Sequence, residues 1–219
     1  MTHVLITGCN RGIGRAMAEE ALRRGWHVSG TLRSGTAPQG VATIPLDVTD
    51  FDRLAPALAQ LAPLDILINN AGVIGPANDQ QHPLSMDFDG FAHTLKVNTL
   101  APLAVAHAAL PALRSAASAR ILTVSSQMAY MGYRKPDRIA YRTSKAAVNK
   151  VMQGLATALE PAGIAVANID PGWVRTDMGG AEADLEVRDV AQGILSVAEG
   201  LTLDQTGQFL KWTGERREY

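Results

Sequence analysis

The chain has 219 residues, of which 47% are apolar and 19% charged, and its formal net charge at pH 7 is −1. This balance excludes a disordered chain and leaves no basic surface for nucleic acid or anionic lipid. The single cysteine, Cys9, excludes an intrachain disulfide framework and a cysteine-based zinc site. No apolar run approaches the ~20 residues of a membrane span, and the first residues show no secretory signal pattern. We therefore expect a cytoplasmic protein of one domain.

Short apolar runs alternate with longer amphipathic segments along the chain. The apolar runs do not alternate with polar residues, which is typical of parallel strands buried on both faces. This pattern predicts an α/β fold of the Rossmann type, a doubly wound parallel sheet of about seven strands with helices on both faces. In chain order we expect a strand at 4–7, a helix at 11–24, strands at 27–33 and 42–47, a helix cap at Thr49/Asp50, a strand at 65–69, a long helix at 85–114, a strand at 120–125, a helix at 139–160, a strand at 164–170, a helix at 187–199 and a strand at 208–211.

The connection between the second and third strands is unusually short. Only residues 34–40 separate them, whereas a parallel crossover usually needs a dozen or more residues. We expect the helix between these strands to be missing or truncated, which leaves that side of the sheet thinly covered.

A glycine-rich turn joins the first strand to the first helix. Residues 7–14 read Thr-Gly-Cys-Asn-Arg-Gly-Ile-Gly, and glycines let the backbone approach a ligand closely. The helix that follows offers its N-terminus to a pyrophosphate. The glycine spacing differs from that of the common dinucleotide motif, so a tight turn without a ligand is the alternative. We expect Cys9 to be a packing residue here, although a helix N-terminus can also lower a thiol pKa.

The end of the second strand distinguishes NAD from NADP. An acidic residue there would bind the ribose hydroxyls and favour NAD, but this chain has Leu32 and Arg33. Arg33 and Arg11 together offer two guanidinium groups that suit a 2′-phosphate. We therefore expect NADP(H) to be preferred over NAD(H), with two merely solvated arginines as the alternative.

Tyr141 and Lys145 lie four residues apart at the start of a predicted helix and so share one face. A free tyrosine has a pKa near 10, and a nearby ammonium group favours the phenolate. Lys145 is therefore expected to lower the pKa of Tyr141 toward the range in which a general acid/base works. A surface tyrosine beside a surface lysine is the alternative.

Two further positions are unusual for the elements that hold them. Ser125 and Ser126 follow the fifth strand, where a hydroxyl can hold a carbonyl oxygen or make an ordinary turn. Asn98 falls inside the long helix, where asparagine is unfavourable. Because Pro102 has no N–H, the main-chain carbonyl of Asn98 lacks its usual helical hydrogen-bond donor four residues later. We expect a kink at this point and a freed carbonyl that can hold a water molecule.

These motifs together resemble the short-chain dehydrogenase/reductase family over nearly the whole chain. The resemblance is closest to its C-factor-like and sniffer-like carbonyl reductase branch. The matching pieces are 7–14, Asp47-Val48, 69–72, Asn98, Ser126, Tyr141, Lys145 and 171–178.

The resemblance implies one dinucleotide-binding oxidoreductase domain over 1–219, with a small substrate lid around 174–187. It implies hydride transfer between NADP(H) and a small carbonyl or alcohol substrate, without a metal. Tyr141 would be the general acid/base, Ser126 would orient the carbonyl and Asn98 would anchor a relay water, while Lys145 would lower the pKa of Tyr141 and hold the nicotinamide ribose. The spacing from Ser126 to Tyr141 is longer than usual, so Ser125 remains an alternative. The cofactor residues implied are Gly8, Asn10, Arg11, Gly12, Ile13, Gly14, Arg33, Asp47, Val48, Asn70, Ala71, Gly72, Tyr141, Lys145, Pro171, Gly172, Val174 and Thr176.

The substrate pocket is expected between the loop 127–138 and the segment after Pro171. Its candidate apolar residues are Met128, Tyr130, Met131, Tyr133, Trp173 and Met178. Basic residues in the same loop attract an acidic substrate in one interpretation and form a solvated surface in the other. They are Arg134, Lys135 and Arg138.

Partners and competing functions stay open at this point. The resemblance implies a homodimer or homotetramer, packed through alanine-rich faces of the helices that begin at 85 and 139. A nicotinamide-binding sensor or signalling module with incidental catalysis is the main alternative. A sugar-nucleotide epimerase or dehydratase is another, but it needs a larger substrate domain.

Overall fold

The computed structural model describes residues 1–61 and 63–219. It confirms the doubly wound sheet, in the strand order β3-β2-β1-β4-β5-β6-β7-β8. All neighbouring strands are parallel except the last pair, in which β8 runs antiparallel to β7. The strands are β1 (His3–Thr7), β2 (His27–Leu32), β3 (Ala42–Pro45), β4 (Ile66–Asn69), β5 (Arg120–Val124), β6 (Ala165–Asp170), β7 (Phe209–Lys211) and β8 (Arg216–Arg217).

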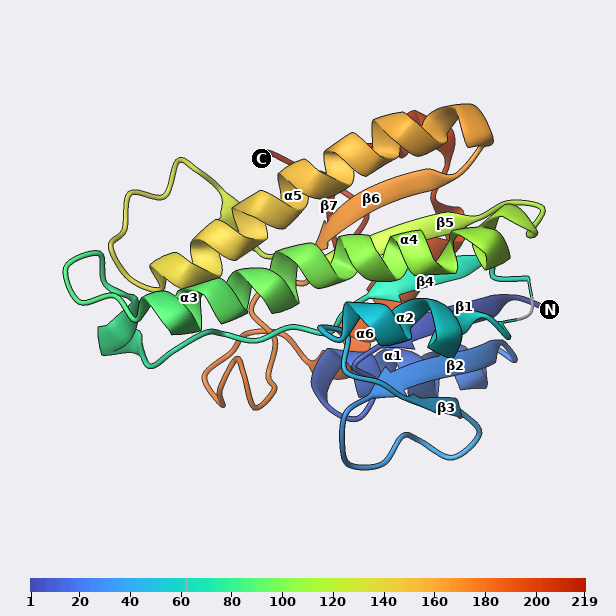
Figure 1. The fold of residues 1–219 in the computed structure, drawn as a ribbon, viewed down its shortest axis with the longest axis horizontal. Helices are drawn as coiled ribbons and strands as arrows, with labels where there is room; N and C mark the ends of the chain where they lie inside the picture. Colours follow the sequence, from blue (N-terminus) through green and yellow to red (C-terminus); the bar gives the residue numbers. More distant parts are fainter. Residues whose placement is uncertain (62) are drawn as a thin grey trace.

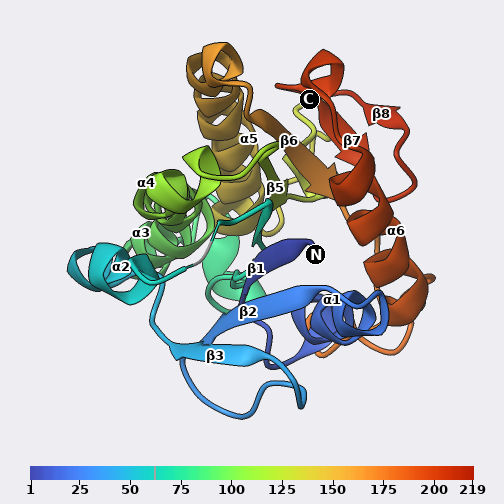
Figure 2. The ribbon, with the colours of Figure 1, turned by 90° about the vertical axis from the view of Figure 1, so that its right-hand side faces the viewer.

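Helices cover both faces of this sheet (Figures 1 and 2). Alternate residues of β1 show how the two faces are filled, because side chains in a strand point to opposite sides. Val4 and Ile6 belong to a buried cluster with residues of α1 and α6, whereas Leu5 belongs to a second cluster with residues of α2, α4 and α5. The α-helices are α1 (Gly12–Arg23), α2 (Phe51–Leu58), α3 (Phe88–Leu95), α4 (Ala101–Arg114), α5 (Ile139–Leu159) and α6 (Val187–Gly200).

The short connection between β2 and β3 contains no helix. Residues 33–41, all of which the structure describes, form bends, turns and irregular backbone. The prediction of a missing crossover helix is therefore confirmed. Three of the four β3 residues are exposed, so this edge of the sheet is thinly covered, as expected.

The long helix predicted at 85–114 is interrupted where the sequence indicates a kink. It starts at Phe88, because the side chain of Asp87 caps it by accepting from the Gly90 N–H at 2.9 Å. Between α3 and α4 lies a π-helical turn, η2 (Lys96–Leu100), in which the Ala101 N–H donates to the Lys96 carbonyl. Proline at 102 has no N–H, and a wider turn accommodates this loss.

The remaining connections contain four short 3₁₀ helices. These are η1 (Asn78–Gln81), η3 (Gln127–Ala129), η4 (Glu160–Ala162) and η5 (Leu203–Gln205). β8 is the one strand that the sequence pattern did not predict, since two charged residues carry no apolar signal. Within the described residues no helix has the length and apolarity needed to span a membrane.

Candidate active site

The site is a cavity of about 470 Å³ at the carboxyl ends of the parallel strands. It lies at the ends of the neighbouring strands β1 and β4, where the direction of winding reverses, which is the usual ligand position in such sheets. All eighteen residues that the sequence assigned to a cofactor line it, and so do Ser125 and Ser126. Asn98 is the one predicted catalytic residue that lies behind the wall.

The glycine turn is held in a conformation that side chains would not permit. Gly8 and Gly12 have positive φ angles of 70° and 53°. A β-carbon at Gly14 would lie 2.2 Å from the Gly8 carbonyl oxygen. The first turn of α1 has no side-chain cap and no acidic residue, and its residues Gly12, Ile13 and Gly14 line the cavity. This arrangement fits a pyrophosphate.

The loop after β4 is bonded directly to the glycine turn. The Thr7 hydroxyl accepts from the N–H groups of Asn70 and Ala71, both at 3.0 Å. The Asn70 side chain donates back to the carbonyls of Thr7 at 2.9 Å and Gly8 at 3.2 Å. These hydrogen bonds hold the glycine turn after β1 and the loop after β4, which form two walls of the cavity, in a fixed relative position.

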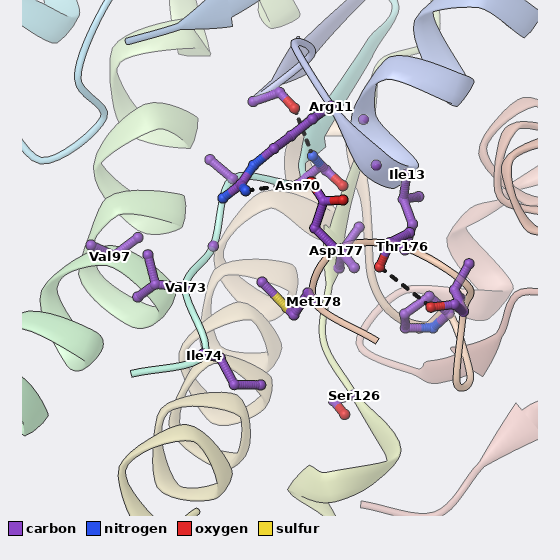
Figure 3. A pocket seen from close by; sticks show the side chains of 18 of the residues that line it. Arg11, Ile13, Asn70, Val73, Ile74, Val97, Ser126, Thr176, Asp177 and Met178 are labelled. Carbon is purple, nitrogen blue, oxygen red and sulfur yellow. Dashed lines mark hydrogen bonds and ion pairs between the residues drawn. The ribbon is translucent and has the colours of Figure 1, made fainter. Parts of the chain in front are cut away.

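Both arginines at this end of the cavity already face carboxylates. Arg33 lies 3.6 Å from Asp47, and Arg11 lies 3.7 Å from Asp177. Partial burial raises the pKa of Asp47, but hydrogen bonds from Thr49 and the charge of Arg33 hold it below its ordinary value. Figure 3 shows Arg11 and Asp177 together at one end of the cavity, with Ser126 at the other and Met178 between them. The arginines are thus neither unpaired nor buried.

Tyr141 lies in the first turn of α5 and is almost completely buried. Burial raises the pKa of Tyr141 to about 12, and the charge of Asp170 adds to this. A hydrogen bond with Ser126 and the charge of Arg138 act in the opposite direction. The Tyr141 N–H donates to the side-chain oxygen of Gln81 in η1 at 3.2 Å. The phenol is therefore protonated at neutral pH.

Lys145 contacts the ring of this tyrosine from one turn further along α5. Its Nζ lies over the Tyr141 ring, 5.7 Å from the ring centre, and donates to the Val124 carbonyl at 2.8 Å. Burial lowers the pKa of Lys145 itself to about 8. The net pKa of Tyr141 is raised and not lowered in this structure, because desolvation of the phenol is the largest effect. The role of Lys145 in lowering that pKa stays a prediction.

The two candidate serines differ in what they face. Ser125 is buried, and its hydroxyl donates to the main-chain carbonyl of Lys145 at 3.4 Å. Ser126 lies in the cavity, accepts from the Met128 N–H at 3.1 Å, and hydrogen-bonds with Tyr141. The geometry favours Ser126 as the serine that shares a substrate atom with Tyr141.

Asn98 acts on the cavity wall through its side chain, a role that the sequence pattern did not predict. Its amide group accepts from the Val73 N–H at 2.9 Å and donates to the Val73 carbonyl at 2.8 Å. The same amide nitrogen donates to the Ser144 hydroxyl at 2.9 Å. A β-carbon at Gly72 would lie 3.2 Å from Asn98 Oδ1 and 3.7 Å from Lys145 Nζ. Asn98 therefore holds the loop after β4 against α5, next to the lysine.

The other end of the cavity has an apolar wall. Met128, Trp173 and Met178 line it as expected, whereas Met131 and Tyr133 are exposed outside it. Val73, Ile74 and Val97 form the opposite side in Figure 3 and carry no motif that singled them out. Arg138 also lines this end, at the N-terminus of α5, with a positive φ of 51° that is unique among the described non-glycine residues. This end of the cavity thus combines apolar walls with the guanidinium group of Arg138.

The segment after Pro171 is closed by its own hydrogen bonds. Val174 and Leu185 form an isolated β-bridge, and the Trp173 indole donates to the Gly179 carbonyl at 2.8 Å. A β-carbon at Gly179 would lie 2.0 Å from the Val174 carbonyl oxygen. This compact loop borders the cavity beside Met178.

Cys9 is a packing residue. Burial raises the pKa of its thiol, although a backbone hydrogen bond acts against this. A β-carbon at Gly30 would lie 2.3 Å from Cys9 Sγ, so the sulfur fills the space that this glycine leaves. The alternative of a reactive thiol with a lowered pKa is wrong.

Two buried residues near the site were not identified from the sequence. Gln81 holds the Tyr141 N–H, and its amide group also donates to the carbonyls of Ile74 and Pro76. Asp170 ends β6 and binds the backbone on both sides of the cavity floor. An acidic residue that closes an apolar strand is a signal for Asp170, but a glutamine in a polar loop gives none. No group of three or more potential metal-ligating side chains occurs among the described residues.

Comparison with known proteins agrees with this geometry. Residues 2–186 match the family model for short chain dehydrogenases. The chain is 39% identical to C-signal of Myxococcus xanthus over 156 residues, and this match covers 69% of this chain and 90% of C-signal. The fold matches the carbonyl reductase Sniffer of D. melanogaster with a TM-score of 0.90 and 28% identity, over 100% of both chains. It also matches an NADPH-bound carbonyl reductase from chicken fatty liver with a TM-score of 0.90 and 29% identity, over 100% of this chain and 99% of that one. The chain therefore belongs to the short-chain dehydrogenase/reductase family of oxidoreductases.

Proposed function

We propose that the protein reduces small carbonyl compounds to alcohols with NADPH, in a reversible reaction. The observation that carries this proposal is the meeting of Tyr141, Ser126 and Lys145 at one end of a cavity whose other end is the glycine turn. The bound nicotinamide supplies the hydride, which no side chain of the chain can provide.

In this proposal the polar residues handle the proton. The Ser126 hydroxyl holds the carbonyl oxygen, and Tyr141 donates its phenolic proton to that oxygen as the carbonyl carbon is reduced. A pKa raised to about 12 keeps Tyr141 protonated at neutral pH, which suits proton donation. The reverse reaction needs the phenolate and is therefore expected to accelerate as the pH rises.

Lys145 and Asn98 support the tyrosine in this scheme. The Lys145 ammonium group offers donors for the ribose hydroxyls and a route for a proton to return to Tyr141. We place a relay water at the main-chain carbonyl of Asn98, in the π-helical turn. The Asn98 side chain holds the Gly72–Val73 backbone next to Lys145, which keeps this corner open.

The preference for NADP rests on Arg11 and Arg33. Both guanidinium groups lie at the adenosine end, where Arg11 pairs with the exposed Asp177 and Arg33 with the partly exposed Asp47. Such pairs contribute about 0–1 kcal/mol, so a 2′-phosphate competes with them at little cost. The carbonyl reductase from chicken fatty liver, which has the same fold, binds NADPH, and this supports the same preference.

The substrate end suits a compact, largely apolar carbonyl compound. Met128, Trp173 and Met178 provide the apolar wall, and the compact loop within 174–187 is the proposed lid. We further propose a cytoplasmic homodimer or homotetramer built by one domain over 1–219. Ala106 and Ala109 are buried within the chain, so the contact would use the exposed Leu100 and Leu103 instead.

The test follows NADPH absorbance with aldehydes, diketones and quinones, using the wild type beside Tyr141→Phe. Tyrosine-dependent turnover supports the reductase. NADPH binding with no turnover by the wild type contradicts it and favours the second candidate, a nicotinamide-binding sensor or signalling module. That candidate draws on the name C-signal of the Myxococcus relative, but it gives no reason for a complete set of Asn98, Ser126, Tyr141 and Lys145. Tightly retained NAD without net NADPH consumption would instead indicate an epimerase or dehydratase.

A further inference from the structure

The carboxylate of Asp170 joins two segments that wall the active site. Its Oδ1 accepts from the N–H of Gln127 at 2.9 Å and from the N–H of Gly172 at 3.0 Å. Gln127 directly follows Ser126, and Gly172 directly follows Pro171. One oxygen atom therefore fixes both the turn that presents the serine and the turn that borders the cofactor.

The other oxygen of Asp170 faces the C-terminal strand. Arg217 of β8 places its Nη1 3.1 Å from Asp170 Oδ2. Only 19% of the arginine side chain and 4% of the aspartate side chain are exposed. A carboxylate this buried has lost its hydration, so it needs an oppositely charged partner to stay ionised. Among the salt bridges of the described residues, Arg217 is its partner.

Arg217 reaches this position because β8 pairs antiparallel with β7, with Phe209 opposite Arg217. β7 in turn lies beside β6, where Lys211 is opposite Asp170. The match to the family model ends at residue 186, so this strand lies beyond the region that identifies the family. Arg217 thus contributes a charge behind the two turns, at Gln127 and Gly172, that line the cavity.

We propose that Arg217 is a positioning residue for the reaction: by pairing with Asp170, it holds the turns at Ser126 and Gly172 in their working geometry. This inference rests on the proposed function. It predicts that Arg217 is needed for full activity even though it does not line the cavity.

The pair also acts on the charge around Tyr141. The charged groups that face this phenol are Asp170 of β6, Arg138 just before α5, and Lys145 of α5. The uncharged Ser126 hydrogen-bonds with it from the loop after β5. Loss of Arg217 leaves the Asp170 charge uncompensated and is expected to raise the pKa of Tyr141 further. Loss of the Asp170 charge is expected to lower that pKa, since this carboxylate is one of the groups that raise it.

The experiment compares Arg217→Gln, Arg217→Lys and Asp170→Asn in the full chain. Arg216→Gln is the matched control, because Arg216 is the exposed neighbour in the same strand. Alcohol oxidation with NADP is measured as kcat/KM from pH 6 to 10.5, with NADPH affinity and thermal unfolding measured in parallel. We expect Arg217→Gln to lower kcat/KM about tenfold to a hundredfold and to move the profile to higher pH. Arg217→Lys should recover most of the loss, and Asp170→Asn should move the profile to lower pH.

Several results would overturn the inference. These are an Arg217→Gln profile that matches the wild type, an equal effect of Arg216→Gln, or shifts of Arg217→Gln and Asp170→Asn in the same direction. If Arg217→Gln does not fold, the Asp170→Asn/Arg217→Gln double variant tests the inference in its place. This variant is expected to fold, because it leaves no unpaired charge buried. A profile like that of Asp170→Asn supports the inference, and a wild-type profile contradicts it. A wild type without turnover would instead contradict the proposed function.

Discussion

Ion pairs of the same kind lie in opposite surroundings at one end of the cavity and behind the wall at its other end. At the glycine-turn end, the side chains of Arg11 and Asp177 are 67% and 81% exposed, and the Arg33–Asp47 pair is also open to solvent. At the tyrosine end, Asp170 and Arg217 are largely buried. Exposed pairs contribute about 0–1 kcal/mol, whereas breaking a buried pair costs about 3–5 kcal/mol. The first kind can exchange partners with a ligand, and the second kind fixes the framework.

The largest effect on the tyrosine end of the cavity is expected when the hydroxyl group of Tyr141 is removed. Tyr141→Phe is expected to lower NADPH-dependent turnover by roughly 10²–10⁴-fold, because it removes the hydroxyl to which the proposal assigns the proton donation. NADPH affinity, measured by fluorescence, should fall far less than turnover, because the variant keeps the aromatic ring and loses one hydroxyl among many cofactor contacts. Tyr133→Phe is the control, since Tyr133 is exposed outside the cavity. Equal activity of both variants would remove Tyr141 from the mechanism.

The contrast in burial is tested directly by stability. Asp170→Ala is expected to reduce the free energy of unfolding by about 3–5 kcal/mol, because it strands the Arg217 charge and two N–H groups. Asp177→Ala should cost no more than about 1 kcal/mol. Urea titrations of both variants and the wild type measure the difference. Similar costs for the two aspartates would break the comparison.

Lys145 makes the buried end sensitive to pH. Burial lowers its pKa to about 8, against an ordinary value of 10.5. Between pH 8 and 10 the unfolded chain therefore holds a proton that the folded chain has lost, so folding becomes more stable as the pH rises. The full effect over the interval to 10.5 is about 3 kcal/mol. The difference in unfolding free energy between wild type and Lys145→Met should vary with pH in this window, and a constant difference would contradict the burial effect.

Crowding of the glycine turn gives a smaller effect. Gly14→Ala is expected to cost about 1–3 kcal/mol, because its β-carbon would lie 2.2 Å from the Gly8 carbonyl oxygen. It should also weaken NADPH binding. A β-carbon at Gly154 in α5 meets nothing within 4 Å, so Gly154→Ala should be neutral or stabilising by up to about 1 kcal/mol. Thermal unfolding and NADPH titration compare the two, and a stable, fully binding Gly14→Ala would refute the tight fit.

The smallest change is expected at the exposed pair. Arg33→Ala should raise the dissociation constant for NADPH about tenfold, as the loss of one charge-assisted phosphate contact predicts. NADH affinity should change little, and the effect should shrink at high salt because the contact is exposed. Equal losses for both cofactors would end the assignment of Arg33 to the 2′-phosphate.

Local sequence signals located most of the site. The glycine turn, the serine after β5, and the Tyr141–Lys145 spacing are contiguous motifs, and the structure places them around one cavity as parallel strands require. Pro102 located the break in the long helix, but only the packing of the loop after β4 gave the Asn98 side chain its partners. Whether Ser125 or Ser126 faces Tyr141 depended on which way the chain turned after β5.

The sequence by itself determined most of the helices and strands, the missing crossover helix and the residues of the motifs that line the cavity, because apolar periodicity, glycine and proline act over short distances. Only the tertiary structure decided the electrostatic environment of the site. It determines that burial raises the pKa of Tyr141, that Arg11 and Arg33 face carboxylates, and that Arg217 pairs with Asp170. These facts depend on desolvation and on contacts between residues far apart in the chain, such as 170 and 217. No local sequence pattern encodes the desolvation of a side chain or a contact between distant residues.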